Sequence, residues 1–131
     1  MTFEAVRLLL PAAIWLVACG AQANCFKVEE LSGYSAKNWA DYRFEADGIS
    51  KALYIVIDGE DSFVSDSDLV CRPLVESLPS LVCMFMEGSK NTVETWSIDL
   101  EAGKAFYTKS TQGYGQFDGI MALVGTATRC D

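Results

Sequence analysis

The sequence predicts a mostly β protein: a small antiparallel meander curled into a barrel or a sandwich, with one short helix and two disulfides. Three observations support this fold class. Apolar and polar residues alternate along several stretches, so that Trp96, Ile98 and Leu100 would share one face of a strand. Residues 51–58 are rich in β-branched and aromatic side chains, which favour strands. Four cysteines follow residue 23, an even number that fits two bridges.

Three strands are expected in the first half of the chain. Residues 25–29 alternate and suit a first strand. Residues 42–47 also alternate, and residues 51–58 have the composition of a strand that is buried on both faces. Because Asp47-Gly48 is a hairpin-type turn sequence, we expect the second and third of these runs to pair as a hairpin.

The second half is expected to begin with the short helix, over residues 73–78. Pro73 suits the first turn of a helix, and Pro79 would end it. Four strands then follow as an antiparallel meander. We place them near residues 81–86, 92–100, 105–109 and 120–128.

The four downstream cysteines are expected to form the two disulfides. If the first and last strands pair in antiparallel fashion, the start of one lies beside the end of the other, which would join Cys25 to Cys130. Cys71 would then pair with Cys83. A zinc site is the rival interpretation, but the chain has neither a C-x-x-C pair nor any histidine, so we expect no bound metal.

The N-terminus has the pattern of an export signal. A weakly positive start is followed by an uncharged, mostly apolar run over residues 8–18, which as a helix would span only about 16 Å and so could not cross a membrane core of roughly 30 Å. The A-x-A sequence at residues 21–23 predicts cleavage before Asn24. The export signal would then be residues 1–23, and residues 24–131 would form a single β-rich domain.

A second cleavage site is also present. The sequence Leu16-Val17-Ala18-Cys19 resembles a bacterial lipobox. That resemblance implies a lipid on the Cys19 thiol, a signal ending at residue 18, and stable anchoring through two acyl chains. In either case the sequence predicts an exported protein of the bacterial periplasm, with lipid anchoring to the envelope as the favoured outcome.

The formal net charge of −8 bears on the partners. Nucleic acid is not expected as a partner, because phosphate binding needs clustered lysine and arginine. Contact with a membrane is expected only through a lipid anchor at Cys19. A cationic protein would be attracted to this surface, although a negative surface also serves solubility alone.

The absence of histidine limits the catalytic chemistry. Imidazole is the usual acid or base near neutral pH, and catalytic triads and most metal sites use it. Residues 58–68 contain five carboxylates, which would suit calcium, but their spacing does not follow the calcium-loop pattern and a solvated loop is favoured. We therefore expect neither a cofactor nor enzymatic activity.

Two aromatic residues are candidates for partner contact. Tyr114 and Phe117 belong to a glycine-rich stretch between two strands, where exposed aromatic side chains often meet a partner, although they could instead fold back as a lid. We therefore expect a non-enzymatic exported envelope protein that binds another protein or has a structural role. One alternative is a small-ligand carrier with an apolar barrel cavity, lined by Trp39, Tyr54 or Trp96. Another is an inhibitor of a basic enzyme such as lysozyme, because inhibitors of that type are similar in size and anchoring.

Overall fold

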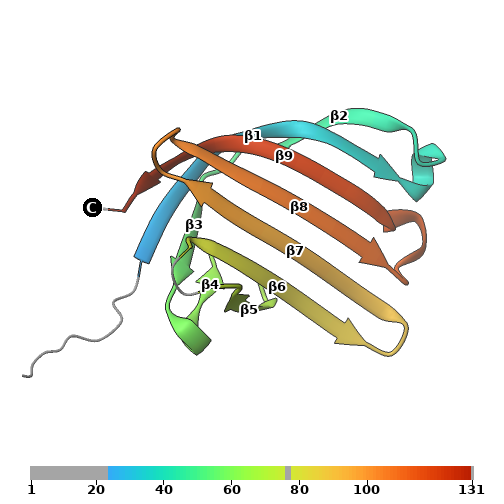
Figure 1. The fold of residues 1–131 in the computed structure, drawn as a ribbon. Helices are drawn as coiled ribbons and strands as arrows, with labels where there is room; N and C mark the ends of the chain where they lie inside the picture. Colours follow the sequence, from blue (N-terminus) through green and yellow to red (C-terminus); the bar gives the residue numbers. More distant parts are fainter. Residues whose placement is uncertain (1–23, 76–77, 131) are drawn as a thin grey trace, which may run out of the picture.

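The computed structural model describes residues 24–75 and 78–130, which form an antiparallel sheet curled into a nearly closed barrel (Figure 1). Along the sheet the strand order is β4-β3-β1-β9-β8-β7-β6-β5, and β2 pairs with β1 outside this path. The strands are β1 (Asn24–Lys37), β2 (Phe44–Ile49), β3 (Leu53–Ile57), β4 (Phe63–Val64), β5 (Val70–Pro73), β6 (Ser80–Glu87), β7 (Lys90–Asp99), β8 (Lys104–Gln112) and β9 (Gly119–Arg129). The prediction of a mostly β protein is confirmed. Of the two shapes that were expected, a barrel and a sandwich, the sheet has the barrel shape.

The C-terminal meander is confirmed. Strands β6, β7, β8 and β9 each pair with the next in antiparallel fashion, and they lie side by side at the front of Figure 1. The register places Leu81 opposite Trp96, Trp96 opposite Tyr107, and Tyr107 opposite Leu123. These four side chains therefore share the inner face of the sheet, where they are buried.

The short helix expected over residues 73–78 is wrong. Pro73 ends β5 instead of beginning a helix, and Leu74 and Val75 are not helical, while residues 76 and 77 lie outside the described part. The pairing of β5 with β6 explains the difference, because it leaves only a short connection between the two strands. The described residues form three 3-10 turns, η4 (Asn38–Ala40), η5 (Gly59–Asp61) and η6 (Gly115–Phe117), and contain no helix long and apolar enough to cross a membrane.

The expected hairpin of residues 42–47 with residues 51–58 is also wrong. Both β2 and β3 pair with β1, which is long enough to accommodate them one after the other. Asp47-Gly48 lies within β2 and not at a turn. Gly48 is needed there for a different reason, since a Cβ would lie 2.7 Å from the Leu31 carbonyl oxygen.

A β-bulge divides β1 into two parts. The pairing with β9 shifts between Glu29 and Ser32, and Glu30 has a φ of 57°, which few residues other than glycine adopt. Before the bulge the even-numbered residues point inward, as the buried Val28 does. After the bulge the odd-numbered residues point inward, so Ser35 is buried while Tyr34 faces outward and is exposed.

The core lies on the inner side of the sheet, both before and after the bulge. Buried side chains from eight strands fill it, and the largest that are fully buried are Trp96, Phe26, Ile55, Leu81, Leu123 and Val28. The disulfide Cys25–Cys130 joins the start of β1 to the end of β9, and Cys71–Cys83 joins β5 to β6. Both predicted disulfides are confirmed, and they are compatible with an exported protein.

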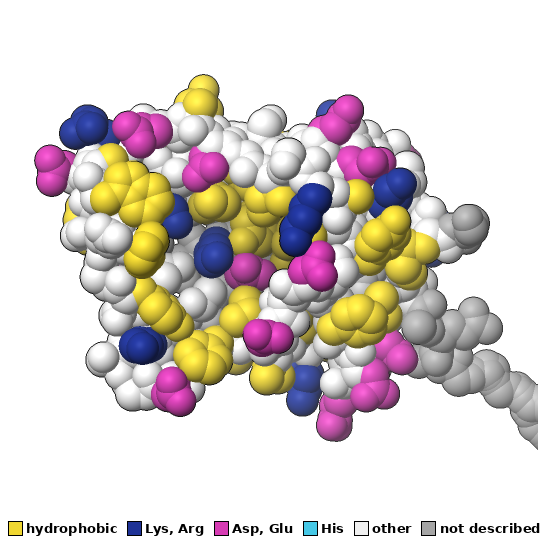
Figure 2. All heavy atoms as spheres, turned by 180° about the vertical axis from the view of Figure 1, so that it is seen from behind, with side chains coloured by type: hydrophobic (Ala, Val, Ile, Leu, Met, Phe, Trp, Pro, Cys, Tyr) yellow, Lys and Arg dark blue, Asp and Glu magenta, His cyan; other side chains and the backbone are white. Residues whose placement is uncertain are grey.

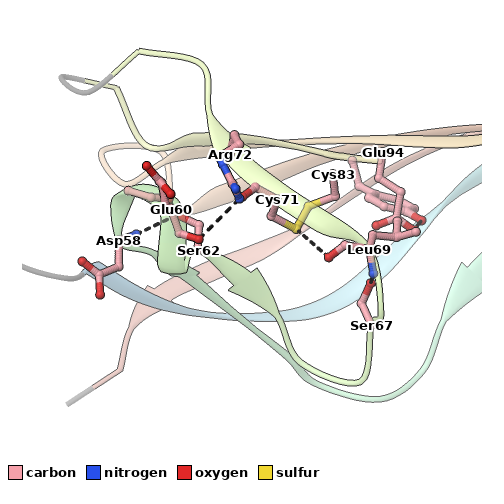
Figure 3. Close-up of a disulfide and its surroundings, with 11 residues drawn as sticks. Asp58, Glu60, Ser62, Ser67, Leu69, Cys71, Arg72, Cys83 and Glu94 are labelled. Atoms are coloured by element: carbon pink, nitrogen blue, oxygen red, sulfur yellow. Dashed lines mark hydrogen bonds between the residues drawn. A yellow bond between two sulfur atoms is a disulfide. The ribbon is translucent and has the colours of Figure 1, made fainter. Parts of the chain in front are cut away.

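The two outer edges of the sheet meet where the barrel nearly closes (Figure 3). Strands β4 and β5 form these edges. Neither exceeds four residues, which limits the number of unpaired backbone N–H and C=O groups at the edges. Arg72, next to the Cys71–Cys83 bridge, spans the gap by donating a hydrogen bond from Nη1 to the Glu60 carbonyl oxygen, 3.3 Å away. The edges are therefore joined through a side chain.

Candidate functional site

A hollow of about 410 Å³ opens on the inner side of the curled sheet. Figure 2 shows this side of the molecule, with hydrophobic side chains on the floor of the hollow and both basic and acidic side chains at its centre. Leu53, Val64 and Leu69 belong to its apolar lining, and Trp96 and Tyr107 line it from β7 and β8. Its volume falls within the range of sites for small molecules.

A buried carboxylate lies in this hollow. Glu94 on β7 is only 8% exposed, and its Oε2 accepts a hydrogen bond of 2.9 Å from the Tyr107 hydroxyl. The Lys109 Nζ lies 3.9 Å from the same oxygen. The register explains the cluster, because Glu94 and Lys109 are direct cross-strand neighbours. Burial and then the Glu94 carboxylate raise the pKa of Tyr107 well above its usual value, so Tyr107 keeps its proton and remains a donor.

Trp96 adds an unpaired donor to the cluster. Its side chain is 2% exposed and packs on the Tyr107 ring with 4.3 Å between the ring centroids. Among the described residues, nothing accepts a hydrogen bond from its indole Nε1. A buried polar group without a partner costs free energy. Because Trp96 follows Glu94 by two residues on β7, the unpaired N–H and the carboxylate belong to the same face of the sheet.

Further charged groups surround this cluster. Burial, and then the positive charge of Lys109, lower the pKa of Lys37 at the end of β1, and the Asp47 carboxylate opposes the shift. Lys51, which also lines the hollow, donates a hydrogen bond of 3.1 Å from Nζ to Asp66 Oδ2. The lysines that line the hollow therefore each lie beside a carboxylate, and the lining needs no strongly charged ligand for balance.

On the opposite side of the same strands, the part that follows the β1 bulge is uncharged, and Asp99 and Lys104 lie beyond it at the far ends of β7 and β8. We define the outer face as the outward side chains that follow the β1 bulge and continue across β2, β9, β8, β7 and β6. It includes a groove of about 770 Å³ between Tyr34 and Phe44 on one side and Val93 on the other. Ala122 and Ile120 also line the groove, as does Lys109, whose Nζ lies beside Glu94 on the inner side. The members of the outer face are Ser32, Tyr34, Phe44, Ala46, Val82, Met84, Val93, Thr95, Ser97, Phe106, Thr108, Ser110, Ile120, Ala122 and Val124.

The aromatic residues predicted to contact a partner lie at one end of the barrel. Phe117, at the end of η6, is 55% exposed and packs edge-on against Trp39 in η4, with 5.9 Å between the ring centroids. Tyr114 is half-buried beneath Lys90, whose Nζ lies 5.7 Å from the ring centroid. The Asp118 carboxylate fixes the turn by accepting a hydrogen bond of 2.7 Å from the Tyr114 backbone N–H. Contact of Tyr114 and Phe117 with a partner stays a prediction.

Only one residue of the hollow was predicted correctly from the sequence. Of the three aromatic residues suggested for a cavity, Trp96 lines it, whereas Trp39 and Tyr54 are exposed and do not belong to its lining. The cluster of Glu94 with Tyr107 and Lys109 was not predicted from the sequence. A signal was present, because Glu94 is in phase with Trp96 and Ile98, which places a charge on the buried face of a strand.

The acidic stretch over residues 58–68 is divided between η5, β4 and the loop that follows. Among the described residues, no three histidine, cysteine, aspartate or glutamate side chains are placed to hold a metal ion. The predicted export signal and the lipid attachment at Cys19 lie outside the described residues.

Comparisons with protein-family models, curated proteins and solved structures found no match. The class of the protein therefore follows from its own geometry, which is that of a disulfide-bonded antiparallel barrel with a charged hollow on its inner side and an uncharged face on its outer side.

Proposed function

We propose that the protein is an exported, non-enzymatic binding protein whose hollow holds a small polar ligand. The observation that carries the proposal is the buried Glu94 carboxylate, with Tyr107 and Lys109 around it and the unpaired Trp96 N–H beside it. Concave sites with apolar walls and a few convergent polar groups are typical of ligand binding.

The energetics of the cluster support this proposal. A buried ion pair adds little to stability compared with apolar residues of similar volume, because desolvation of the charges offsets their attraction. The unpaired Trp96 N–H adds a further cost. A role in ligand binding explains such an arrangement, because a ligand can form the hydrogen bonds that these groups lack.

The same groups define the chemistry of the ligand. The Trp96 N–H requires a hydrogen-bond acceptor, and the Glu94 carboxylate accepts from a donor. Because the lysines of the hollow lie beside carboxylates, a neutral ligand fits better than a strongly charged one. Hydroxyl and amide groups offer donors and acceptors together, so the ligand class we propose is a small sugar, amino sugar or peptide fragment.

Export to the periplasm, with a lipid on Cys19, is part of the proposal. The signal pattern of residues 1–18 and the lipobox resemblance support it, and the two disulfides are compatible with it. The intact mass of the protein from its native host tests this part. A mass that begins at a diacylated Cys19 is expected, whereas a mass that begins at unmodified Asn24 would contradict lipid anchoring.

Trp96 provides a direct test of ligand binding. In a Trp39→Phe variant, Trp96 would be the one tryptophan left among the described residues, and its emission would report on the hollow. We would titrate this variant with glucose, N-acetylglucosamine, its disaccharide, and a glycine dipeptide at millimolar concentration. At least one probe should change the emission in a saturable way and raise the melting temperature by mass action.

A matched pair of variants locates the binding. Glu94→Gln should weaken the response at least about tenfold, equivalent to ~1.4 kcal/mol, whereas Asp61→Asn, an exposed acid in η5, should leave it unchanged. If no probe changes either the emission or the melting temperature, the proposed ligand class is wrong. Equal binding by both variants would remove the hollow as the site.

The exposed Trp39–Phe117 pair favours a second candidate function, the binding of a cationic protein such as lysozyme. Aromatic side chains that project from a negatively charged protein are typical binding anchors. Retention on immobilised lysozyme at low salt, reduced by Phe117→Ala and by moderate salt, is the expected result. No retention at either salt concentration would exclude this candidate.

A further inference from the structure

The outer face exposes large apolar side chains to a degree that a solvated surface does not require. Tyr34 is 62% exposed and Phe44 is 71% exposed, and both border the groove of about 770 Å³. Five further members of the outer face lie among the exposed large hydrophobic residues or the groove lining: Phe106, Ile120, Val124, Met84 and Val93. Contiguous apolar patches of this kind mark interaction surfaces.

The charge distribution makes this face unusual for the molecule. The chain carries 28 charged residues and a net charge of −8, yet none of the outer-face members is charged. On the inner side of the same strands, by contrast, lie Lys37, Asp47, Glu94 and Lys109. The absence of charge is therefore specific to the outer face, and the nearest outward charges, Arg72 on β5 and the Asp99–Lys104 pair on β7 and β8, lie at its borders.

We infer that the outer face is the interface of a homodimer, in which two copies pack sheet against sheet about a two-fold axis. This inference goes beyond the proposed function, because it concerns the surface opposite the hollow. Antiparallel sheets pack face to face in this way when each presents an apolar side, with strand directions within about 30° of each other.

The shape of the face suits a second copy of the chain. Tyr34 and Phe44 are large exposed side chains on the paired strands β1 and β2, which we call the ridge, and both border the groove. A two-fold axis brings the same patch of both copies together, so the ridge of each copy can enter the groove of the other. The small exposed side chains of Ala122 and Thr108 line the groove and leave room for an aromatic ring.

The electrostatics distinguish a second copy from other occupants. A charged protein would find no countercharge on this face, and an anionic membrane would meet a protein of net charge −8 with no lysine or arginine among the outer-face members. Two copies bring two uncharged faces into contact, while their remaining surfaces repel each other. Salt screens that repulsion, so the dimer should become more stable as ionic strength rises.

Sedimentation equilibrium of the oxidised protein tests the inference. The full chain would carry Cys19→Ala to prevent lipidation, and would be purified after export over a range of concentrations with low and high sodium chloride. We expect the average mass to approach twice that of the monomer, at lower protein concentration in high salt than in low salt.

Charged substitutions locate the interface. Ala122→Arg in the groove and Phe44→Lys on the ridge should each give a monomer, and both positions are exposed, so the fold should survive, as circular dichroism would show. Phe117→Arg, an exposed aromatic residue outside the outer face, is the matched control and should still dimerise. A wild-type protein that stays monomeric at every concentration overturns the inference, as does a dimer that persists in both variants. Binding of the monomer to neutral phosphatidylcholine vesicles, abolished by Ala122→Arg, would assign the face to lipid instead.

Discussion

The two halves of the barrel, before and after the β1 bulge, have opposite polarity. In the closed half, which contains the Cys25–Cys130 disulfide, apolar side chains such as Val28 point inward, and outward positions include the ion pair of Lys27 with Glu29. In the open half, charged side chains such as Glu94 and Lys109 point into the hollow, and apolar side chains point outward. The buried core accounts for stability and extends into the open half as far as Leu81 and Trp96. The open half also presents two surfaces suited to binding.

One residue produces much of this difference in β1. The alternation of side chains has a period of two, so a single extra residue reverses which ones face the core. Without the bulge at Glu30, Tyr34 would point inward and Ser35 outward. A local backbone feature therefore decides which side of the open half is polar.

Glu30→Pro should have the largest effect. Proline fixes φ at about −65° and cannot take the positive φ of the bulge, so strict alternation along β1 would turn Tyr34 toward the inner side, against the pairing with both β2 and β9. We expect loss of cooperative unfolding in urea. As a control, Glu30→Gly keeps the bulge and suits its positive φ, so it should change the free energy of unfolding by less than about 1 kcal/mol. A proline variant as stable as this control would contradict the role of the bulge.

Removal of the disulfides should have the next largest effects. The Cys25–Cys130 bridge spans a sequence separation of 105 residues and the Cys71–Cys83 bridge only 12. By the chain-entropy estimate their loss costs about 5 and about 3 kcal/mol. Urea unfolding of the two double-serine variants measures both costs. A larger cost for the shorter loop would show that chain entropy does not dominate.

Apolar truncations should separate the inner side of the sheet from the outer face. Leu81 is fully buried on the inner side, so Leu81→Ala should lower the free energy of unfolding by about 2–5 kcal/mol. Phe44 is 71% exposed in the open half, and Phe44→Ala should stay within about 0.5 kcal/mol when measured on the monomer. Similar costs at the two positions would mean that the outer face is packed within the monomer.

Tyr107→Phe should have a smaller effect that depends on pH. Loss of the hydroxyl leaves the buried Glu94 carboxylate without this donor, which costs about 1–3 kcal/mol. Because folding raises the pKa of Tyr107, its contribution is complete below about pH 10, the ordinary pKa of a tyrosine side chain. The contribution is lost as the pH rises above that value, where only the unfolded chain releases the proton. The stability difference between the wild type and Tyr107→Phe should therefore narrow above about pH 10. A constant difference would contradict the raised pKa.

The sequence predicts the parts of this fold that depend on local alternation and on cysteine pairing. The meander over residues 80–129 follows from period-two patterns, and the Cys25–Cys130 bridge follows from the pairing of the first and last strands. The placement of β2 and β3 could not be read locally, because it depends on the length of β1.

The candidate hollow was less predictable. Glu94 could be recognised as a charge on a buried strand face, but its meeting with Tyr107 and Lys109 depends on the register of β7 with β8. The outer face depends on the bulge. Nothing in the sequence marks the bulge, because the residue with the positive φ is Glu30 and not a glycine.

Hydroxyl-radical footprinting of the dilute monomer tests most directly whether the open half has reversed polarity. Mass spectrometry would compare the oxidation rates of Tyr34 and Phe44 with those of the exposed Phe117 and the buried Tyr107. We expect Tyr34 and Phe44 to be oxidised at rates close to that of Phe117. Protection of both residues to the level of Tyr107 would show that they point into the barrel, and would contradict the account.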